Sequence, residues 1–453
     1  MLKPFNYYAD ASLRYIKYIL FVIFFNFLQY GLLTVTGISW VVLIDDAIIL
    51  YMAAIILLPG NQNIRFVKTF LDKPLIALAI MFTASALLNI TPLMNCIFAF
   101  KNYFLIFFLF YFIIYSKLID QKGVERIIRF VFALFSIELI IQITQIISRT
   151  VFNISFLSSS KSGLFDDIAI GTFSGSNDLS YCYFFVLFYV AYLFIVEKRR
   201  EYLRYMIIFC VGLVVSFGLY SILMFPILFV LYNLKHFFHH TGDLKRYIII
   251  AGVFIAIFGI LVSMNLLSNK MVDQRDMFYL FKPSFITKKI LVDEYNVWSG
   301  SARLLWYPVT QARLQEYAYH PLVGMGPGMY ASYAAFRLMP HTNESIYNLF
   351  GQIEIGLDPY VDSQIIPIWG ELGYIGLFLF LMLFIMSAVH FYRIFTRAES
   401  LQLKALAVTA SAASVYMLLG TYVNHFIENQ NIMINFILFI AFAEKVYLIE
   451  RKK

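Results

Sequence analysis

Long apolar runs separated by short charged connectors dominate this chain of 453 residues. A helix needs about 20 residues to cross a hydrocarbon core of about 30 Å, and most of the runs approach or reach that length. Strands exposed to lipid would leave backbone groups unpaired, so we expect the runs to be helical. Hydrophobic residues make up 61% of the chain and charged residues only 14%, far from the averages of soluble domains. The sequence therefore predicts an all-α polytopic membrane protein.

Twelve apolar runs are predicted to span the membrane. The first follows a charged stretch and no small-residue cleavage site ends it, so we expect a retained helix rather than a removed signal peptide. The predicted spans are 15–36, 39–58, 75–90, 96–116, 126–148, 179–196, 206–219, 221–234, 247–267, 365–391, 404–423 and 430–448.

Basic residues orient these spans, because cytoplasmic connectors carry an excess of Lys and Arg. The run 206–234 has basic residues on both flanks, which predicts a helical hairpin or a re-entrant pair. Most of the 35 Lys and Arg residues then fall on the cytoplasmic side. The protein is thus expected in the bacterial inner membrane with both termini cytoplasmic. The predicted organisation is 1–148 for helices 1–5, 149–178 for a first extracytoplasmic loop, 179–267 for helices 6–9, 268–364 for a large helical extracytoplasmic loop, and 365–453 for helices 10–12 with a cytoplasmic tail.

Cysteine and charge usage exclude several other classes of function. Cys96, Cys182 and Cys210 lie in apolar runs without a CxxC or zinc-site spacing, so neither a disulfide framework nor a metal is expected. The net charge of +8 is explained by the orientation of the spans rather than by nucleic-acid binding. We expect no cofactor and no nucleic-acid partner.

The large loop contains the stretch SGSARLLWYPVTQARLQEYAYHPLVGMGPGMY at 299–330. Its apolar spacing predicts an amphipathic helix near 300–318. Arg303 and Arg313 are ten residues apart, which places them roughly 80° apart around an ideal helix. Guanidinium groups suit phosphate because they bind its oxygens in pairs. The alternative is an arginine that pairs with Glu316.

A glycine cluster follows this helix. Glycines with a neighbouring proline allow a tight turn, which is the favoured interpretation. Exposed amides in such a turn could instead form an anion-binding nest. The residues concerned are Gly324, Gly326, Pro327 and Gly328.

Ionisable residues then gather just before or inside the next span. Charged groups that enter a membrane helix are costly and are therefore functional candidates. His341 and Asp362 are predicted general bases, whereas Glu371 is either functional or stabilised by a helix N-terminus. Asp45 and Asp46, early in the second span, are expected to cap or pack a helix. The gathered set is Arg337, His341, Glu344, Glu354, Asp358, Asp362 and Glu371.

The order of SGSARLLW, HPLVGMGPGMY and ELGYIGLFLF resembles the O-antigen polymerase and ligase family, in which an Arg-Trp helix leads to an HP-x-x-G-x-G turn. The Arg-x10-Gly spacing of polymerases in this group fits Arg313 and Gly324. The stretch GLFDDIAIGTFSGSNDLSY at 163–181 looks like the family's Gly-x-Phe and Asn motif. The resemblance covers two loops and the overall topology.

This resemblance implies a GT-C-like integral membrane glycosyltransferase that takes an undecaprenyl-diphosphate-linked glycan as donor, without nucleotide sugar or metal. Arg303 and Arg313 would hold the diphosphate, with Arg337 as a further candidate. Catalysis would stabilise the charge that develops on the leaving group while a base takes the acceptor proton. The lipid bilayer and a chain-length regulator protein would be partners.

One departure bears on the reaction. Ligases of this family place HisAsn nine residues before the Glu-x-Gly of the next helix, and here Asp362 and Ser363 occupy those positions before Glu371. The base is therefore open between Asp362 and His341. This favours a polymerase of O-antigen, capsule or exopolysaccharide repeat units over a ligase acting on lipid A core. A flippase or transporter of lipid-linked oligosaccharides is the alternative from another class.

Overall fold

The computed structural model describes residues 3–152, 154, 156–157, 169–173, 175–216, 218–239, 250, 252, 303–338, 363–422, 424–426 and 429–452. This part of the chain is helical and contains no strand; one isolated bridge joins Ile64 to Ser116. The all-α prediction is confirmed for it. The elements are α1 (Lys3–Thr36), the 3-10 helix η1 (Ser39–Leu43), α2 (Ile44–Leu57), α3 (Asp72–Leu88), α4 (Leu93–Phe100), the π-helix η2 (Lys101–Leu105), α5 (Phe107–Tyr115), α6 (Gln121–Phe152), α7 (Ser176–Glu197), α8 (Arg200–Val215), α9 (Leu219–His239), α13 (Arg303–Leu314), α14 (His320–Val323), α15 (Tyr333–Leu338), α17 (Ile365–Arg397), α18 (Leu401–Gly420) and α19 (Gln430–Glu450).

Six of these helices are long and apolar enough to cross a membrane, in α1, α6, α7, α17, α18 and α19. A seventh span results if the helical pair Leu93–Leu105 and Phe107–Tyr115, bent by 43°, is counted as one. The predicted spans at 39–58, 75–90, 206–219 and 221–234 form helices whose apolar parts are shorter than a span. The span predicted at 247–267 lies outside the described residues, apart from 250 and 252. The described part thus matches about half of the twelve predicted spans.

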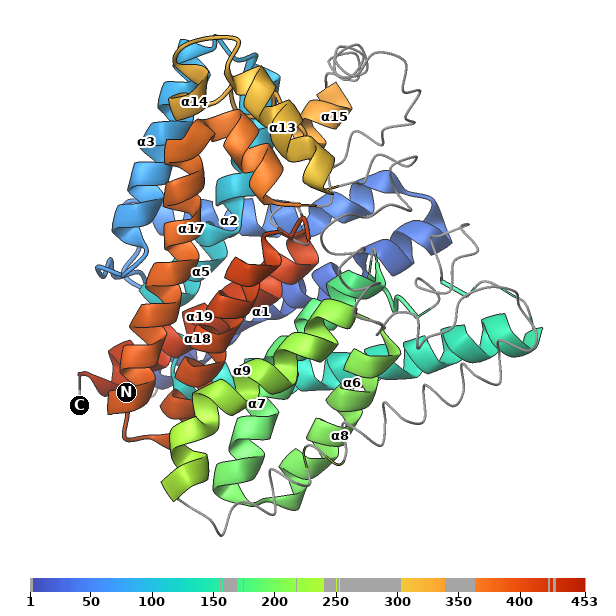
Figure 1. Cartoon of the computed structure of the whole chain (residues 1–453). Helices are drawn as coiled ribbons and strands as arrows, with labels where there is room; N and C mark the ends of the chain where they lie inside the picture. The colour runs from blue at the N-terminus through green and yellow to red at the C-terminus, as the bar shows by residue number, and fades with distance from the viewer. Residues whose placement is uncertain are drawn as a thin grey trace.

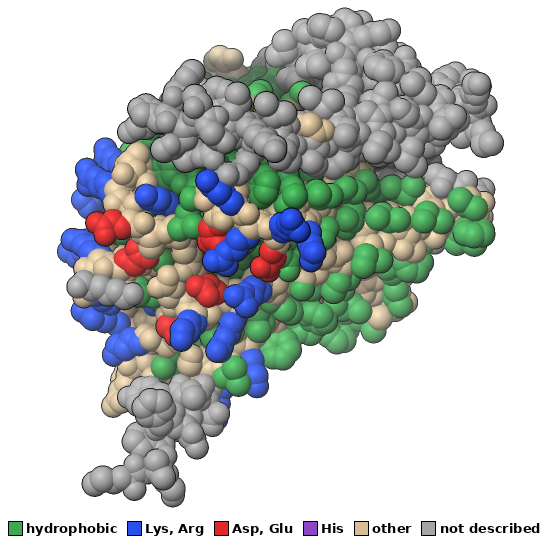
Figure 2. Space-filling model, turned by 90° about the horizontal axis from the view of Figure 1, so that it is seen from below, with side chains coloured by type: hydrophobic (Ala, Val, Ile, Leu, Met, Phe, Trp, Pro, Cys, Tyr) green, Lys and Arg blue, Asp and Glu red, His purple; other side chains and the backbone are tan. Residues whose placement is uncertain are grey.

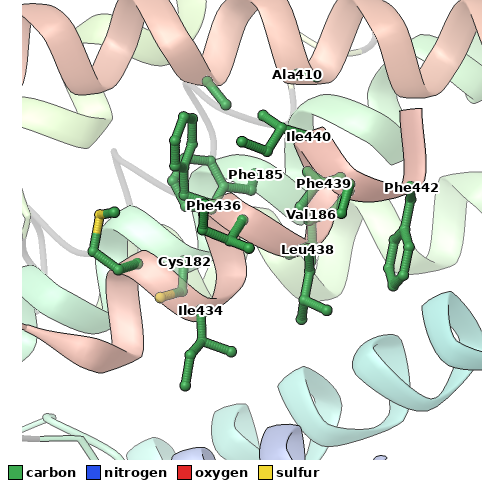
Figure 3. Packing of buried hydrophobic residues seen from close by; sticks show 14 of the residues in the cluster. Cys182, Phe185, Val186, Ala410, Ile434, Phe436, Leu438, Phe439, Ile440 and Phe442 are labelled. Atoms are coloured by element: carbon green, nitrogen blue, oxygen red, sulfur yellow. The ribbon is translucent and has the colours of Figure 1, made fainter. Parts of the chain in front are cut away.

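The centre of the fold is built by α7, α18 and α19. Most of each apolar stretch is buried inside the protein, which explains why these helices are hydrophobic on all sides. Figure 3 shows side chains of α19, among them Phe436 and Phe439, packed against Phe185 of α7 and Ala410 of α18. Phe184 and Tyr416 stack at 3.9 Å between ring centroids in the same core. Helix α17 packs on α18 of this core and in turn contacts α13 and α14.

The two chain termini lie at one end of the molecule, and α13, α14 and α15 lie at the opposite end (Figure 1). The long helix α17 runs between these ends. This arrangement places residues 303–338 at the end of the molecule away from both termini. Which end faces the cytoplasm stays a prediction.

Part of the predicted loop 149–178 is buried among the helices. Gln142 of α6 donates to the carbonyl of Ala169 at 3.0 Å, and Gln145 exchanges two hydrogen bonds with the backbone of Gly171. Glu138 accepts from the amide of Thr172 at 2.9 Å. The sequence predicts an extracytoplasmic loop here, and three polar side chains on successive turns of α6 bind the backbone of 169–173. A segment without secondary structure is thereby held inside an apolar bundle.

Candidate functional site

The glycine turn after α14 packs directly on the first part of α17. Met325 donates its amide to the carbonyl of Gly370 at 2.8 Å, and Gly326 donates to the carbonyl of Glu371 at 3.2 Å. Gly324 has a φ of +79°, and a Cβ built there would lie 2.2 Å from the carbonyl carbon of Glu371. Only glycine fits such a close backbone contact in the left-handed region. The predicted tight turn is confirmed.

A break in α17 completes this contact. Gly373 has φ 67° and ψ −170° inside the helix. A Cβ on Gly373 would lie 2.4 Å from the carbonyl carbon of Leu322, at the end of α14. The glycine turn and α17 therefore approach each other through one glycine on each side. Gly324 lies against the backbone of Glu371, and Gly373 lies against the backbone of Leu322.

The Glu371 carboxylate is fully buried beneath the turn and receives several hydrogen bonds. Tyr103 of η2 donates its hydroxyl at 2.6 Å, and the amide of Tyr330 donates at 3.4 Å. The amide of Gly328 and the hydroxyl of Ser332 interact with the same carboxylate. The end of the turn thus directs two backbone amides at an internal carboxyl group, whereas the alternative in the sequence was a nest of exposed amides.

Two asparagine side chains, one just after the end of α3 and one in α4, hold the turn from the other side. Asn89 donates to the carbonyl of Gly324 at 3.0 Å and contacts Nε2 of His320 at 2.9 Å. Asn95 donates to the carbonyl of Gly328 at 2.6 Å. Burial lowers the pKa of His320, and nearby Glu316 acts in the opposite direction. Since Asn89 Oδ1 can only accept, His320 is arranged as a neutral donor through Nε2.

Helix α13 carries Arg313 to the edge of this assembly. Its guanidinium forms an ion pair of 2.5 Å with Glu316, and the two side chains are 17% and 44% exposed. This contact is the alternative considered for Arg313. Thr310 of the same helix hydrogen-bonds the hydroxyl of Tyr330 at 3.0 Å. Burial raises the pKa of Tyr330 to about 12, and Arg313 is close enough to oppose that rise.

The structure brings together two of the six predicted site residues, Glu371 and Arg313, on either side of Tyr330. Arg303 begins α13 and Arg337 lies in α15, so both are on the helices of this end. His341 and Asp362 lie outside the described residues. The predicted helix at 300–318 ends earlier, at Leu314.

No protein-family profile matches the chain. No curated protein matches it either. The resemblance to the polymerase and ligase family thus rests on the sequence motifs alone.

Sequence reasoning missed a second polar cluster beside η2. Lys101 pairs with Asp46 at 2.5 Å, where the sequence predicts only capping or packing. Asn26 donates to Asn431 at 2.8 Å nearby, and Asn26 also reaches Asp45 at 3.5 Å. The π-helix that supplies Lys101 to this cluster supplies Tyr103 to Glu371. Such segments are frequent at functional sites, but an isolated lysine in an apolar run was the only sequence signal.

We expect Lys101→Met to destabilise the protein by about 3 kcal/mol, because it leaves the buried Asp46 carboxylate without its cation. Arg199→Met is the matched control, since Arg199 pairs with Glu197 at 2.8 Å but is 66% exposed. Removing an exposed pair costs about 1 kcal/mol or less. Thermal unfolding of the purified protein in detergent measures both changes. Equal shifts in the two variants would show that the Lys101–Asp46 pair adds nothing beyond a surface contact.

Proposed function

We propose that the protein is an integral membrane glycosyltransferase that polymerises lipid-diphosphate-linked oligosaccharide repeat units of a surface polysaccharide. The reaction would take place at the extracytoplasmic face of a bacterial inner membrane. The observation that carries this proposal is the packing of the segments that resemble the polymerase and ligase family. The turn HPLVGMGPGMY rests on ELGYIGLFLF, and the helix with Arg313 lies beside both.

The contacts of Glu371 support a positioning role in this proposal. A general base needs an open side on which to take a proton from the acceptor. The Glu371 carboxylate is fully buried and faces Tyr103, Tyr330 and Ser332. We therefore assign it to holding the turn in place. The proposed base remains His341 or Asp362.

In the proposed reaction the bond between the first sugar carbon and the diphosphate oxygen of the donor breaks. A hydroxyl at the non-reducing end of a second lipid-linked unit forms the new glycosidic bond to that carbon. Its proton goes to the base, and the lipid diphosphate leaves with the electron pair. Arg313 would stabilise the charge that develops on this leaving group. Arg303 and Arg337 are the further candidates for the same task.

We expect purified protein in liposomes to convert single lipid-linked repeat units, isolated from cells that lack this gene, into a ladder of longer glycans. Arg313→Ala should lower kcat/KM about 10- to 100-fold, as expected for losing a charge-assisted hydrogen bond worth about 1.5–3 kcal/mol. Glu316→Gln is the matched control, because it removes the same ion pair and keeps the arginine. Gel separation of the glycans measures the chain length.

Three results would contradict the proposal. Transfer to a different acceptor without lengthening would indicate a ligase. Movement of intact units across the bilayer without new bonds would indicate a flippase. Equal loss of activity in Arg313→Ala and Glu316→Gln would show that Arg313 acts only through its ion pair.

A further inference from the structure

A basic pocket lies at the end of the molecule that carries the termini, away from the Glu371 site. The C-terminal ends of α17 and α19 and the start of α18 form it, and its volume is about 380 Å³. Arg393, Arg397 and Arg451 line it together with Glu399 and Glu450. Figure 2 shows that Lys and Arg side chains gather on this lower face, with acidic side chains between them. The pocket therefore lies within a broadly basic surface.

Within the described part of the chain, the side chains of these three arginines make no polar contact. Among the described residues none of them forms an ion pair or a side-chain hydrogen bond, although two glutamates line the same pocket. Glu450 accepts a hydrogen bond from Ser400, the N-cap of α18. With three arginines and two glutamates the pocket carries a formal net charge of +1, and its arginines form no ion pair within the described chain.

Nearby His390 does not supply a further free cation. Its Nε2 contacts Glu444 at 2.6 Å, and the ring of Phe70 stacks on it at 4.3 Å. Basic residues at the end of α17 are also stabilised by the helix dipole, which favours cations at C-termini. That effect explains a single arginine on each helix end. It does not explain why α17 and α19 leave a hollow between their arginines.

We place the pocket at the depth of lipid headgroups by taking the break at Gly373 as the opposite edge of the hydrocarbon core. About 20 residues separate the break at Gly373 from Arg393, which at 1.5 Å per residue is about 30 Å, the thickness of the hydrocarbon core. Tyr392 beside Arg393 is half exposed, as is usual for aromatic residues at a membrane interface. A phosphate at this depth belongs to a lipid more readily than to a soluble anion.

We infer that this pocket binds the phosphate-bearing headgroup of an anionic phospholipid. The guanidinium groups would contact the phosphate oxygens in pairs, and the acyl chains would follow the apolar surface of α17. Lipid binding at this pocket requires only the three arginines and a membrane around α17. A test of this site is independent of the proposed glycosyltransferase activity, because it measures lipid binding and not glycan transfer.

The test is native mass spectrometry of the detergent-purified full chain titrated with phosphatidylglycerol, phosphatidylethanolamine or inorganic phosphate. Saturable binding of phosphatidylglycerol is expected, at least tenfold tighter than that of the other two. Arg393→Gln, Arg397→Gln and Arg451→Gln should each weaken it about fivefold, the effect of one cation at an anionic surface. Arg199→Gln, which removes a cation from the connector between α7 and α8, should leave the affinity unchanged.

The opposite results overturn the inference. Equal weakening by Arg199→Gln would show a diffuse attraction to basic surface. Inorganic phosphate that binds as tightly as the lipid would show a site for soluble anions. Lack of any effect in all three pocket variants would show that these arginines serve only the ends of their helices.

Discussion

Gly324→Ala is expected to destabilise the protein far more than Gly60→Ala, although both glycines have a φ of +79°. A positive φ alone costs about 1–2 kcal/mol for an L side chain, and at Gly324 the ψ of −176° adds to this cost because essentially only glycine adopts that combination. At Gly60 a Cβ would meet nothing within 4 Å, so only the cost of the positive φ applies. At Gly324 the Cβ would lie 2.2 Å from the carbonyl carbon of Glu371. That atom is backbone, so it cannot move aside without shifting α17, and overpacking adds about 1–3 kcal/mol.

Thermal unfolding of the two variants in the same detergent separates these contributions. The midpoint for Gly324→Ala should fall clearly below that for Gly60→Ala, and glycan lengthening should be lost only in Gly324→Ala. Gly373→Ala is a second variant of the same contact, because its Cβ would meet the carbonyl of Leu322 at 2.4 Å. Equal midpoints for Gly324→Ala and Gly60→Ala would contradict the close packing of the turn on α17.

The fold could be predicted from the sequence as far as local patterns extend. Apolar runs predict helices because lipid and a buried core both demand paired backbone groups. The run at 206–234 divides into two helices between Val215 and Leu219, as its length and flanking charges indicate. The number of membrane spans is harder to predict from the sequence. The run at 96–116, for example, is interrupted by a π-helix and bent by 43°, which hydropathy does not reveal.

The candidate site was predictable only in part. The glycine cluster and Glu371 stand out by residue type, so both were found. Their partners Asn95 and Tyr103 lie in apolar runs more than 200 residues away, and no spacing rule connects them with the turn. Pairing at such separation is decided by tertiary packing, which a single sequence does not display. The contact between the turn and the Glu371 carboxyl group was missed for the same reason.

Glu371 and Tyr103 are expected to act as one unit in a double-mutant cycle. Glu371→Ala removes the carboxylate that accepts from the hydroxyl of Tyr103 and from the amide of Tyr330, at about 1–3 kcal/mol for each lost bond. Tyr103→Phe removes one donor and leaves the carboxylate to the others. Once one partner is gone, removing the second costs less. The double variant should therefore be more stable than the sum of the single losses predicts, by about 1–3 kcal/mol.

The variant Glu371→Gln distinguishes whether Glu371 holds the turn in place or acts as the general base. Glutamine keeps one acceptor oxygen but turns an amino group toward donors, so stability should fall, and glycan lengthening should fall with it. A base would behave differently, because its loss removes proton transfer worth about 10²- to 10⁴-fold in rate while the fold remains intact. Thermal unfolding and glycan lengthening measured on one preparation distinguish the two. A Glu371→Gln protein that keeps its midpoint but loses all activity would return Glu371 to the role of base.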